Sequence, residues 1–349
     1  MAAKEIRRKM ISSYENKLQK RAGRRKFPFK IMLYCLAAAV LLIVALCLYM
    51  TQPLIWIANV FPPISVDPAR LEIHVRALSE SFGPRDESHP ENLDRCAAYI
   101  RREFESAHAR VSEQPFTVDG KTYRNVIAHF GPETKEVVVV GAHYDTDGPF
   151  PGADDNASGV AGLLEIARLL GAAQLPVRVE LVAYTLEELP FFRSEQMGSA
   201  MHAKALKREG AVVRVMFSLE MIGYFSDAPD SQQFPFSALS LFYPSEGNFI
   251  SVIGKMGAGT LVRKIKRAMA EATRLPVYSI NAPRLIPGVD FSDHLSYWRE
   301  GYPAVMITDT AFYRNANYHT MWDTAERLDY QRMRQVVEGV YAAVMNQTH

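Results

Sequence analysis

The chain alternates short, almost wholly apolar stretches with longer stretches of helical pattern, and this alternation constrains its fold most. The segment KEVVVVGAHYD at 135–145 is apolar on both faces of an extended chain, as strands of parallel sheets are. Further strands are expected at 123–130, 177–185, 212–223 and 302–310, with helices at 92–107, 157–173, 194–210, 257–273 and 330–346. This order predicts an α/β fold with a mixed, largely parallel central β-sheet and helices on both faces.

One apolar run precedes this body. Residues 31–50, IMLYCLAAAVLLIVALCLYM, contain no charge, and their number suits one transmembrane helix. Lys and Arg gather only before the run, which predicts a cytoplasmic N-terminus and an extracytoplasmic body. No small-x-small cleavage site follows, so a cleaved signal peptide is disfavoured. We expect a single-pass protein of a bacterial inner membrane, with the body facing the periplasm.

Four parts are therefore expected along the chain. They are a basic tail at 1–30, a membrane helix at 31–50, an interfacial linker at 51–66 and a folded domain at 67–349. The domain begins where Asp67 is suited to cap a helix that has Pro68 at its first position. Membrane lipid is an expected partner, whereas the mildly acidic body argues against nucleic acid. Cys96 is the only cysteine of the body, so the body has no internal disulfide.

Acidic residues and histidines gather where the expected strands end. They are His143, Asp145, Asp155, Glu187, Glu188, Glu220 and His319. Carboxyl ends of parallel strands meet at one edge of a sheet, and unpaired buried carboxylates are costly, so a divalent metal is expected there. Imidazole with carboxylate suits zinc, and the absence of Cys favours a catalytic site. Calcium would prefer oxygen ligands with little His.

Five motifs occur in order along the body. They are GAHYDT, PGADDNASG, EE followed by MGS, SDH, and YHTMWDT. With them, the chain from about Asp67 onward resembles the co-catalytic dizinc aminopeptidase family that also contains glutamate carboxypeptidase II and the bacterial leucyl aminopeptidases. The resemblance implies a zinc exopeptidase fold of the phosphorylase/hydrolase-like kind, two zinc ions and a peptide substrate.

The resemblance also implies roles for single residues. One zinc is expected to be held by His143 and Glu220, the other by Glu188 and His319, with Asp155 bridging both. Glu187 resembles the general base, and Asp145 the residue that orients His143. Glu220 stands where better-known members carry Asp. In addition, Phe191 and Phe192 are expected to line the substrate pocket or to pack locally, and His294 to lie near the substrate or behind a ligand.

The favoured function is therefore a membrane-anchored zinc exopeptidase acting as an aminopeptidase. Carboxypeptidase or dipeptidase action is the closest alternative. Glutaminyl cyclases, which are acyltransferases, resemble the chain in its loops, but they use one zinc and lack the full ligand set. Receptor-like relatives have lost ligands, whereas this chain keeps every ligand position. The oligomeric state is not indicated.

Overall fold

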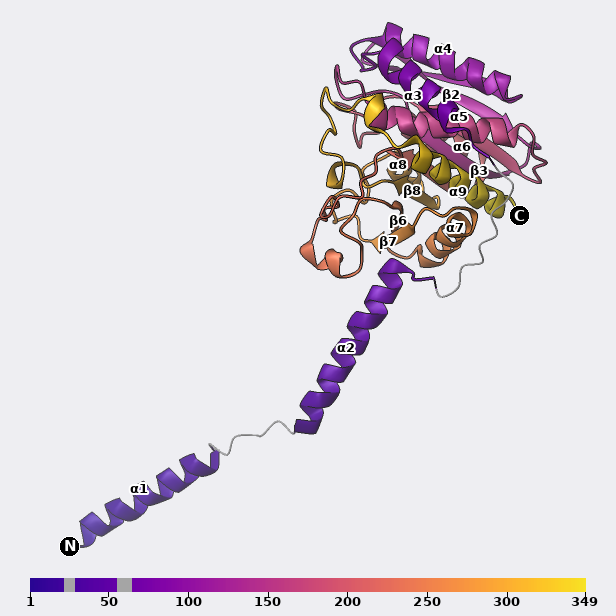
Figure 1. Cartoon of the computed structure of the whole chain (residues 1–349). Helices are drawn as coiled ribbons and strands as arrows, with labels where there is room; N and C mark the ends of the chain where they lie inside the picture. The colour runs from indigo at the N-terminus through magenta and orange to yellow at the C-terminus, as the bar shows by residue number, and fades with distance from the viewer. Residues whose placement is uncertain (22–28, 55–64) are drawn as a thin grey trace. The chain divides into compact units, whose positions relative to one another are not determined.

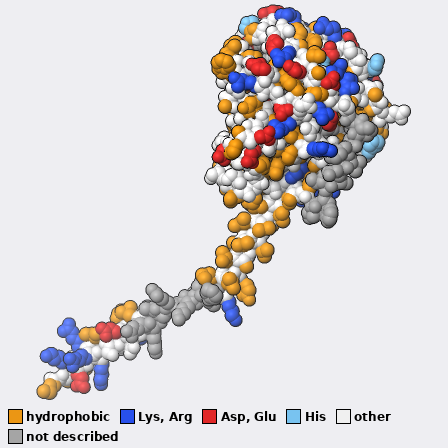
Figure 2. Space-filling model, viewed as in Figure 1, with side chains coloured by type: hydrophobic (Ala, Val, Ile, Leu, Met, Phe, Trp, Pro, Cys, Tyr) orange, Lys and Arg blue, Asp and Glu red, His pale blue; other side chains and the backbone are white. Residues whose placement is uncertain are grey.

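The computed structural model describes residues 1–21, 29–54 and 65–349, which form two compact units, Met1–Leu48 and Tyr49–His349. The first unit holds helix α1 (Ala2–Arg21) and most of helix α2 (Phe29–Thr51). Residues Lys30–Thr51 are long and apolar enough to cross a membrane, which agrees with the expected span. Basic side chains gather on α1, and apolar ones cover α2 (Figure 2). The remaining parts of the expected tail and linker, 22–28 and 55–64, lie outside the described residues.

The second unit is built on an eight-stranded sheet (Figure 1). Its strands are β1 (Arg110–Val118), β2 (Lys121–Phe130), β3 (Glu136–His143), β4 (Arg178–Tyr184), β5 (Val212–Glu220), β6 (Ile250–Lys255), β7 (Val277–Ala282) and β8 (Ala304–Thr308). The order across the sheet is β1-β2-β4-β3-β5-β8-β6-β7. The central pairs β4–β3, β3–β5 and β5–β8 are parallel, while β1–β2, β2–β4 and β6–β8 are antiparallel. The predicted mixed, largely parallel sheet is confirmed.

Helices cover both faces of the sheet. They are α3 (Pro68–Arg76), α4 (Pro90–Ser106), α5 (Gly159–Leu170), α6 (Gly198–Glu209), α7 (Gly259–Ala272), α8 (His294–Arg299) and α9 (Tyr330–Thr348). The Asp67 side chain accepts a hydrogen bond from the Ala69 backbone at 2.9 Å, so it caps α3 as expected. Cys96 is fully buried in α4.

The middle strand β3 is buried on both faces because its valines alternate between two apolar clusters. Val138 and Val140 pack on the side covered by α3, α4, α5, α7 and α9. Val137 and Val139 pack on the side covered by α6 and α8. Both layers therefore pack against this strand and hold it in the middle of the sheet. The carboxyl end of β3 is thereby fixed at the edge where His143 lies.

Candidate active site

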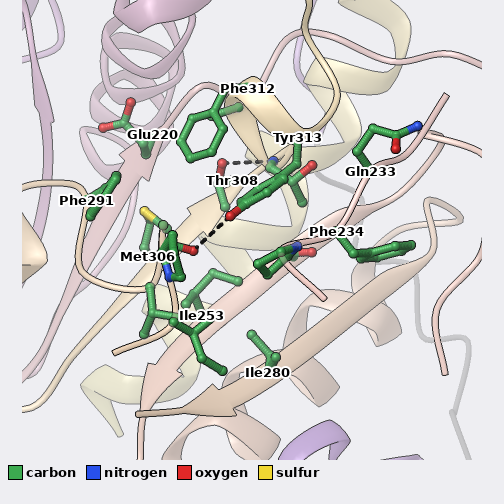
Figure 3. Close-up of a pocket in the computed structure, with 18 of the residues that line it drawn as sticks. Glu220, Gln233, Phe234, Ile253, Ile280, Phe291, Met306, Thr308, Phe312 and Tyr313 are labelled. Atoms are coloured by element: carbon green, nitrogen blue, oxygen red, sulfur yellow. Dashed lines mark hydrogen bonds between the residues drawn. The ribbon is translucent and has the colours of Figure 1, made fainter. Parts of the chain in front are cut away.

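A cavity of about 120 Å³ opens at the carboxyl edge of the sheet (Figure 3). One part of its wall is apolar and aromatic, and Phe234, Ile253, Ile280, Phe291, Met306, Phe312 and Tyr313 belong to it. Another part is acidic and consists of Asp155, Glu187, Glu188 and Glu220. Among the described residues that line the cavity there is no Lys, Arg or His. The cavity therefore suits a molecule with an apolar group next to a positive or metal-coordinated end.

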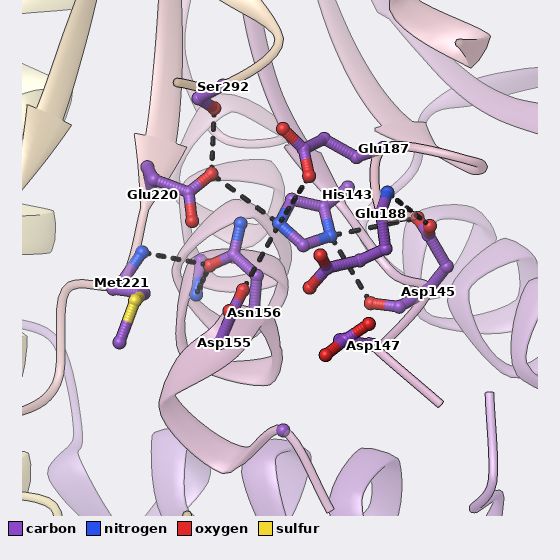
Figure 4. A network of polar contacts seen from close by, with 12 residues as sticks. His143, Asp145, Asp147, Asp155, Asn156, Glu187, Glu188, Glu220, Met221 and Ser292 are labelled. Atoms are coloured by element: carbon purple, nitrogen blue, oxygen red, sulfur yellow. Dashed lines mark hydrogen bonds and ion pairs between the residues drawn. The ribbon is translucent and has the colours of Figure 1, made fainter. Parts of the chain in front are cut away.

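The sheet brings the acidic residues and His143 together from separate loops (Figure 4), and His319 lies beside Asp155 and Glu188. His143 ends β3 and is fully buried, and Glu220 ends the neighbouring β5. Glu187 and Glu188 follow β4, while His319 lies in the loop after β8. Asp155 lies in the helical turn η2 (Ala153–Ser158) that precedes α5. All seven residues expected at the strand ends thus lie in one cluster.

Asp155 lies between the two imidazoles. Its Oδ1 is 3.4 Å from His143 Nε2, and its Oδ2 is 3.1 Å from His319 Nε2. Glu220 Oε2 lies 3.4 Å from the same His143 nitrogen. Glu188 Oε1 lies 3.3 Å from the same His319 nitrogen. The cluster therefore contains two sets of donors that share one carboxylate.

Several of these atoms are buried without a hydrogen-bond partner. They include His143 Nε2, His319 Nε2 and Glu188 Oε1. Buried polar atoms normally have a hydrogen-bond partner, so unpaired atoms at the centre of a cluster indicate a place where a ligand binds. Nitrogen from His and oxygen from carboxylates are the donors that zinc accepts in catalytic sites. The residues present therefore fit a zinc centre.

The pKa values of the cluster reflect its crowding. Burial raises the pKa of Glu187 well above its ordinary value, and Glu188 and Glu220 raise it further. Burial and the charge of Asp155 raise the pKa of Glu188 to about 8. Burial opposes protonation of His319, but Asp155 and Glu188 outweigh it and raise the pKa of His319 to about 10. Metal binding must displace these protons, so metal affinity falls as pH falls.

Further side chains hold the cluster in place. Ser292 donates to Glu220 Oε2 at 2.7 Å, and the Glu188 backbone N–H donates to Asp145 Oδ2 at 3.0 Å. The carboxylate of Asp145 is 3.6 Å from His143 Nδ1, whereas its backbone carbonyl is 3.2 Å from that nitrogen. Both the carboxylate and the carbonyl of Asp145 therefore face His143 Nδ1, and the carboxylate also accepts a hydrogen bond from the neighbouring loop.

The sequence analysis missed three residues that support the site. Asp147 Oδ2 is 3.0 Å from His319 Nδ1, the nitrogen that faces away from the cluster. Asp323 accepts hydrogen bonds from the backbone N–H groups of Asp154 and Asp155 at 3.0 and 3.1 Å. The buried guanidinium of Arg85 donates to the carbonyls of Tyr144 at 2.8 Å and of Gly152 at 3.1 Å. Asp323 lies within the quoted YHTMWDT motif and Asp147 directly follows GAHYDT, so their position was the available signal.

The residues expected near the substrate lie in different places. Phe192 lines the cavity, but Phe191 does not and is buried. His294 does not line the cavity either, because it is fully buried in α8, where Nε2 lies 2.9 Å from the carbonyl of Val289. Its ring packs edge-on against Trp298, and burial lowers its pKa to about 4. His294 therefore supports the chain behind the cavity as a neutral ring.

The sequence profile of Peptidase family M28 matches residues 125–344, which contain every residue of the cluster. The chain belongs to peptidase family M28. It is 48% identical over 301 residues to the uncharacterized protein YfbL of Escherichia coli K12, covering 83% of this chain and 92% of that one. It is 28% identical over 221 residues to leucine aminopeptidase 1 of Paracoccidioides brasiliensis, covering 60% of this chain. That match spans only about half of the fungal protein, 52% of its length.

Solved structures share the M28 fold of this chain. BSAP, a zinc aminopeptidase from Bacillus subtilis, superimposes with a TM-score of 0.63 at 15% identity, covering 81% of this chain and 95% of that one. A glutaminyl cyclase from Bacteroides thetaiotaomicron superimposes with a TM-score of 0.60 at 21% identity, covering 81% and 99%. Two different chemistries therefore occur on this fold, so the fold alone does not choose between them.

Proposed function

We propose that the chain is a membrane-anchored zinc exopeptidase of family M28 that acts as an aminopeptidase. The observation that carries the proposal is the position of Asp155, whose two carboxylate oxygens each face the Nε2 of a different histidine. This arrangement supports two zinc ions. His143 and Glu220 would hold one, Glu188 and His319 the other, and Asp155 would bind both. Zinc in such a site supplies a Lewis acid for the scissile carbonyl and lowers the pKa of a water.

Glu187 is the proposed general base. Its carboxylate is buried at the cavity, and Oε2 lies 4.0 Å from His143 Nε2, farther than the oxygens of Asp155 and Glu220. It therefore remains available to take a proton from the attacking water and to pass it to the nitrogen of the leaving amine. Its raised pKa strengthens it as a base, because a carboxylate that binds a proton more firmly also removes one more readily.

The charge of the cavity favours action at the N-terminus of a peptide. A carboxypeptidase needs a cation to hold the C-terminal carboxylate of its substrate, and the described lining residues offer no Lys or Arg. The acidic wall instead attracts a protonated α-amino group, and the apolar wall accepts the first side chain. The match to leucine aminopeptidase 1 supports the same direction.

The decisive experiment maps products. Zinc-loaded full chain in detergent is incubated with one peptide in three forms: both ends free, acetylated and amidated. Stepwise loss from the N-terminus that acetylation blocks supports the proposal, and loss from the C-terminus that amidation blocks contradicts it. A peptide that begins with Gln tests the cyclase alternative, because cyclisation releases ammonia and removes no residue.

Two variants test the role of Glu187. Glu187→Gln keeps the size of the side chain and removes the base, so we expect kcat to fall by a factor of about 10² to 10⁴ with zinc content unchanged. The matched control is Glu133→Gln, whose side chain is 80% exposed. Equal activity of the two zinc-loaded variants would show that another group takes the proton.

We also propose the arrangement of the chain in the membrane. The tail 1–30 lies in the cytoplasm, 31–50 span the bilayer, 51–66 form the interfacial linker, and the peptidase domain 67–349 faces the periplasm of a bacterium. The excess of Lys and Arg before the span supports this orientation. With a tag at each end of the full chain in spheroplasts, added protease should remove only the C-terminal tag. Removal of the N-terminal tag alone would show that the chain has the opposite topology.

A further inference from the structure

One loop of the domain exposes apolar side chains without any charge among them. Residues 231–245, SQQFPFSALSLFYPS, contain no Asp, Glu, Lys, Arg or His. They lie between β5 and β6 and include the short helical turn η3 (Ser237–Leu241), coral in Figure 1. Leu241 is 80% exposed, Phe236 53% and Phe242 45%. Single exposed apolar residues are ordinary, but a charge-free group of them on one loop marks a binding surface.

The base of this loop and the end of the apolar helix meet at one residue of β7. The Tyr243 hydroxyl donates to the Ser279 carbonyl at 2.8 Å. The Ser279 hydroxyl lies 3.0 Å from the Thr51 carbonyl and 2.9 Å from Gln52 Oε1. Thr51 ends α2, and Tyr49–Gln52 belong to the same compact unit as the loop.

Other contacts hold the end of the helix on the domain. Lys266 Nζ donates to the carbonyls of Thr51 and Gln52 at 3.0 and 3.2 Å. The Gly257 backbone N–H donates to the Tyr49 hydroxyl at 2.7 Å. Lys266 is buried, so it binds the two carbonyls from within the packed domain. The end of the apolar run is therefore part of the folded domain.

We propose that the 231–245 loop contacts the lipid surface of the membrane in which the chain is anchored. A helix of 22 residues from Lys30 to Thr51 is about 33 Å long, which matches a hydrocarbon core about 30 Å thick. Thr51 then lies where the span leaves the lipid. Because Ser279 binds both Thr51 and Tyr243, the base of the loop lies at that surface. Phe, Leu and Tyr with Ser and Gln between them suit the boundary between headgroups and acyl chains.

The position of the loop has a consequence for substrate entry, which rests on the function proposed above. Phe234, Leu239 and Tyr243 line the cavity, so the loop forms part of its wall. A cavity wall in contact with lipid favours peptides whose N-terminal residues are apolar and already lie at the membrane surface. The enzyme would then act mainly on membrane-associated peptides.

The test measures lipid contact directly and needs no catalysis. The full chain carries Leu241→Cys labelled with an environment-sensitive dye, in a background with Cys35→Ala and Cys47→Ala. Cys96 stays, because it is buried and burial raises its pKa to about 12, so it does not react. Nanodiscs of phosphatidylethanolamine and phosphatidylglycerol contain a fraction of lipid with brominated acyl chains, which quench the dye on contact.

The control label is at Val212→Cys. Val212 is 53% exposed and begins β5, so it lies at the amino edge of the sheet, opposite the cavity. We expect quenching at 241 to be at least about twofold stronger than at 212, because an interfacial segment reaches roughly 5–10 Å into the boundary layer. Phe236→Ser with Phe242→Ser should reduce the quenching at 241 and leave that at 212 unchanged.

Two results would overturn the proposal. Equal quenching at 241 and 212 would show that the loop stays in water. A blue-shifted dye at 241 that brominated lipid does not quench would show that protein covers the loop, for example a second copy of the chain. Failure of peptide cleavage leaves these readouts intact, so the lipid contact and the proposed activity are judged separately.

Discussion

The carboxylate of Asp323 offers a sharp test of how the metal loop is held. Asp323 is 2% exposed, and its two oxygens accept the backbone N–H groups of Asp154 and Asp155. Asp323→Asn replaces one acceptor oxygen by an NH₂ group that faces a backbone donor. Burial raises the pKa of Asp323 to about 7, so the comparison is made at about pH 8, where the carboxylate is charged.

The expected loss follows from these contacts. A hydrogen bond to a charged group contributes about 1.5–3 kcal/mol, so losing one lowers the free energy of unfolding by about 2 kcal/mol. A domain of this size shifts by about 2–4 °C per kcal/mol, which gives a fall in Tm of about 4–8 °C. Because the loop carries the proposed bridging ligand, zinc affinity should fall by about 10- to 100-fold.

Calorimetry of the zinc-loaded protein and competition with a chelator measure the two quantities. The matched control is Asp329→Asn. Asp329 accepts the Arg332 backbone N–H at 2.9 Å at the start of α9, where Asn caps as well as Asp, so we expect a change below about 0.5 kcal/mol. If Asp323→Asn matched this control in both Tm and zinc affinity, the proposal that Asp323 holds the metal loop in place would be refuted.

Three further predictions test the site, the electrostatics and the core. Asp155→Asn should bind less than half as much zinc as the wild type and lose activity; full occupancy by mass spectrometry of the native protein would contradict a bridging role. Burial opposes ionisation of Glu165, but His74, Arg70 and Arg168 outweigh it and lower its pKa from 4.5 to about 2. A carboxyl group whose pKa is lowered in the folded chain stabilises the fold at pH values above its unfolded pKa. This stabilisation is lost as pH falls from 4.5 to about 2. Glu165→Gln should therefore weaken the dependence of the free energy of unfolding, measured with urea, on pH between 4.5 and about 2. An unchanged slope would refute this. Gly141→Ala places a methyl group against the ring of Tyr184 and should cost about 1–3 kcal/mol in urea unfolding, whereas an unchanged midpoint would show that the ring moves aside.

The central strands and the acidic cluster could be predicted because both depend on strong local patterns. The runs that became β3, β4 and β5 are nearly all apolar, and acids or histidines follow each of them. Parallel strands then bring those residues to one edge regardless of the details of the loops. For this reason His143, Asp155 and Glu220 come together as expected.

Strands β1, β6 and β7 were not predicted because their patterns are weak. β1 is an edge strand with mostly exposed or half-buried side chains, so it lacks a continuous apolar run. β6 (ISVIGK) and β7 (VYSINA) have six residues each, and Ser, Gly, Lys or Asn interrupt their apolar residues, so neither is a continuous apolar run. Part of the apolar wall of the cavity comes from β6, β7 and the 231–245 loop, so this part of the substrate pocket was not predicted.

Contacts between distant loops also escaped prediction. Arg85 binds the carbonyls of Tyr144 and Gly152 although no motif includes it. A sequence motif reports which residues occur near a site, but the direction of each side chain depends on packing that only the folded chain determines.

The order of the proposed ligands along the chain has a consequence for biosynthesis. His143 lies at the end of β3, whereas His319 follows β8, the strand made last. A growing chain with only β1 to β7 complete holds one imidazole of the pair and lacks the strand that separates β5 from β6. If His143 and His319 act as proposed, peptide cleavage therefore begins only after nearly the whole domain has been made and folded.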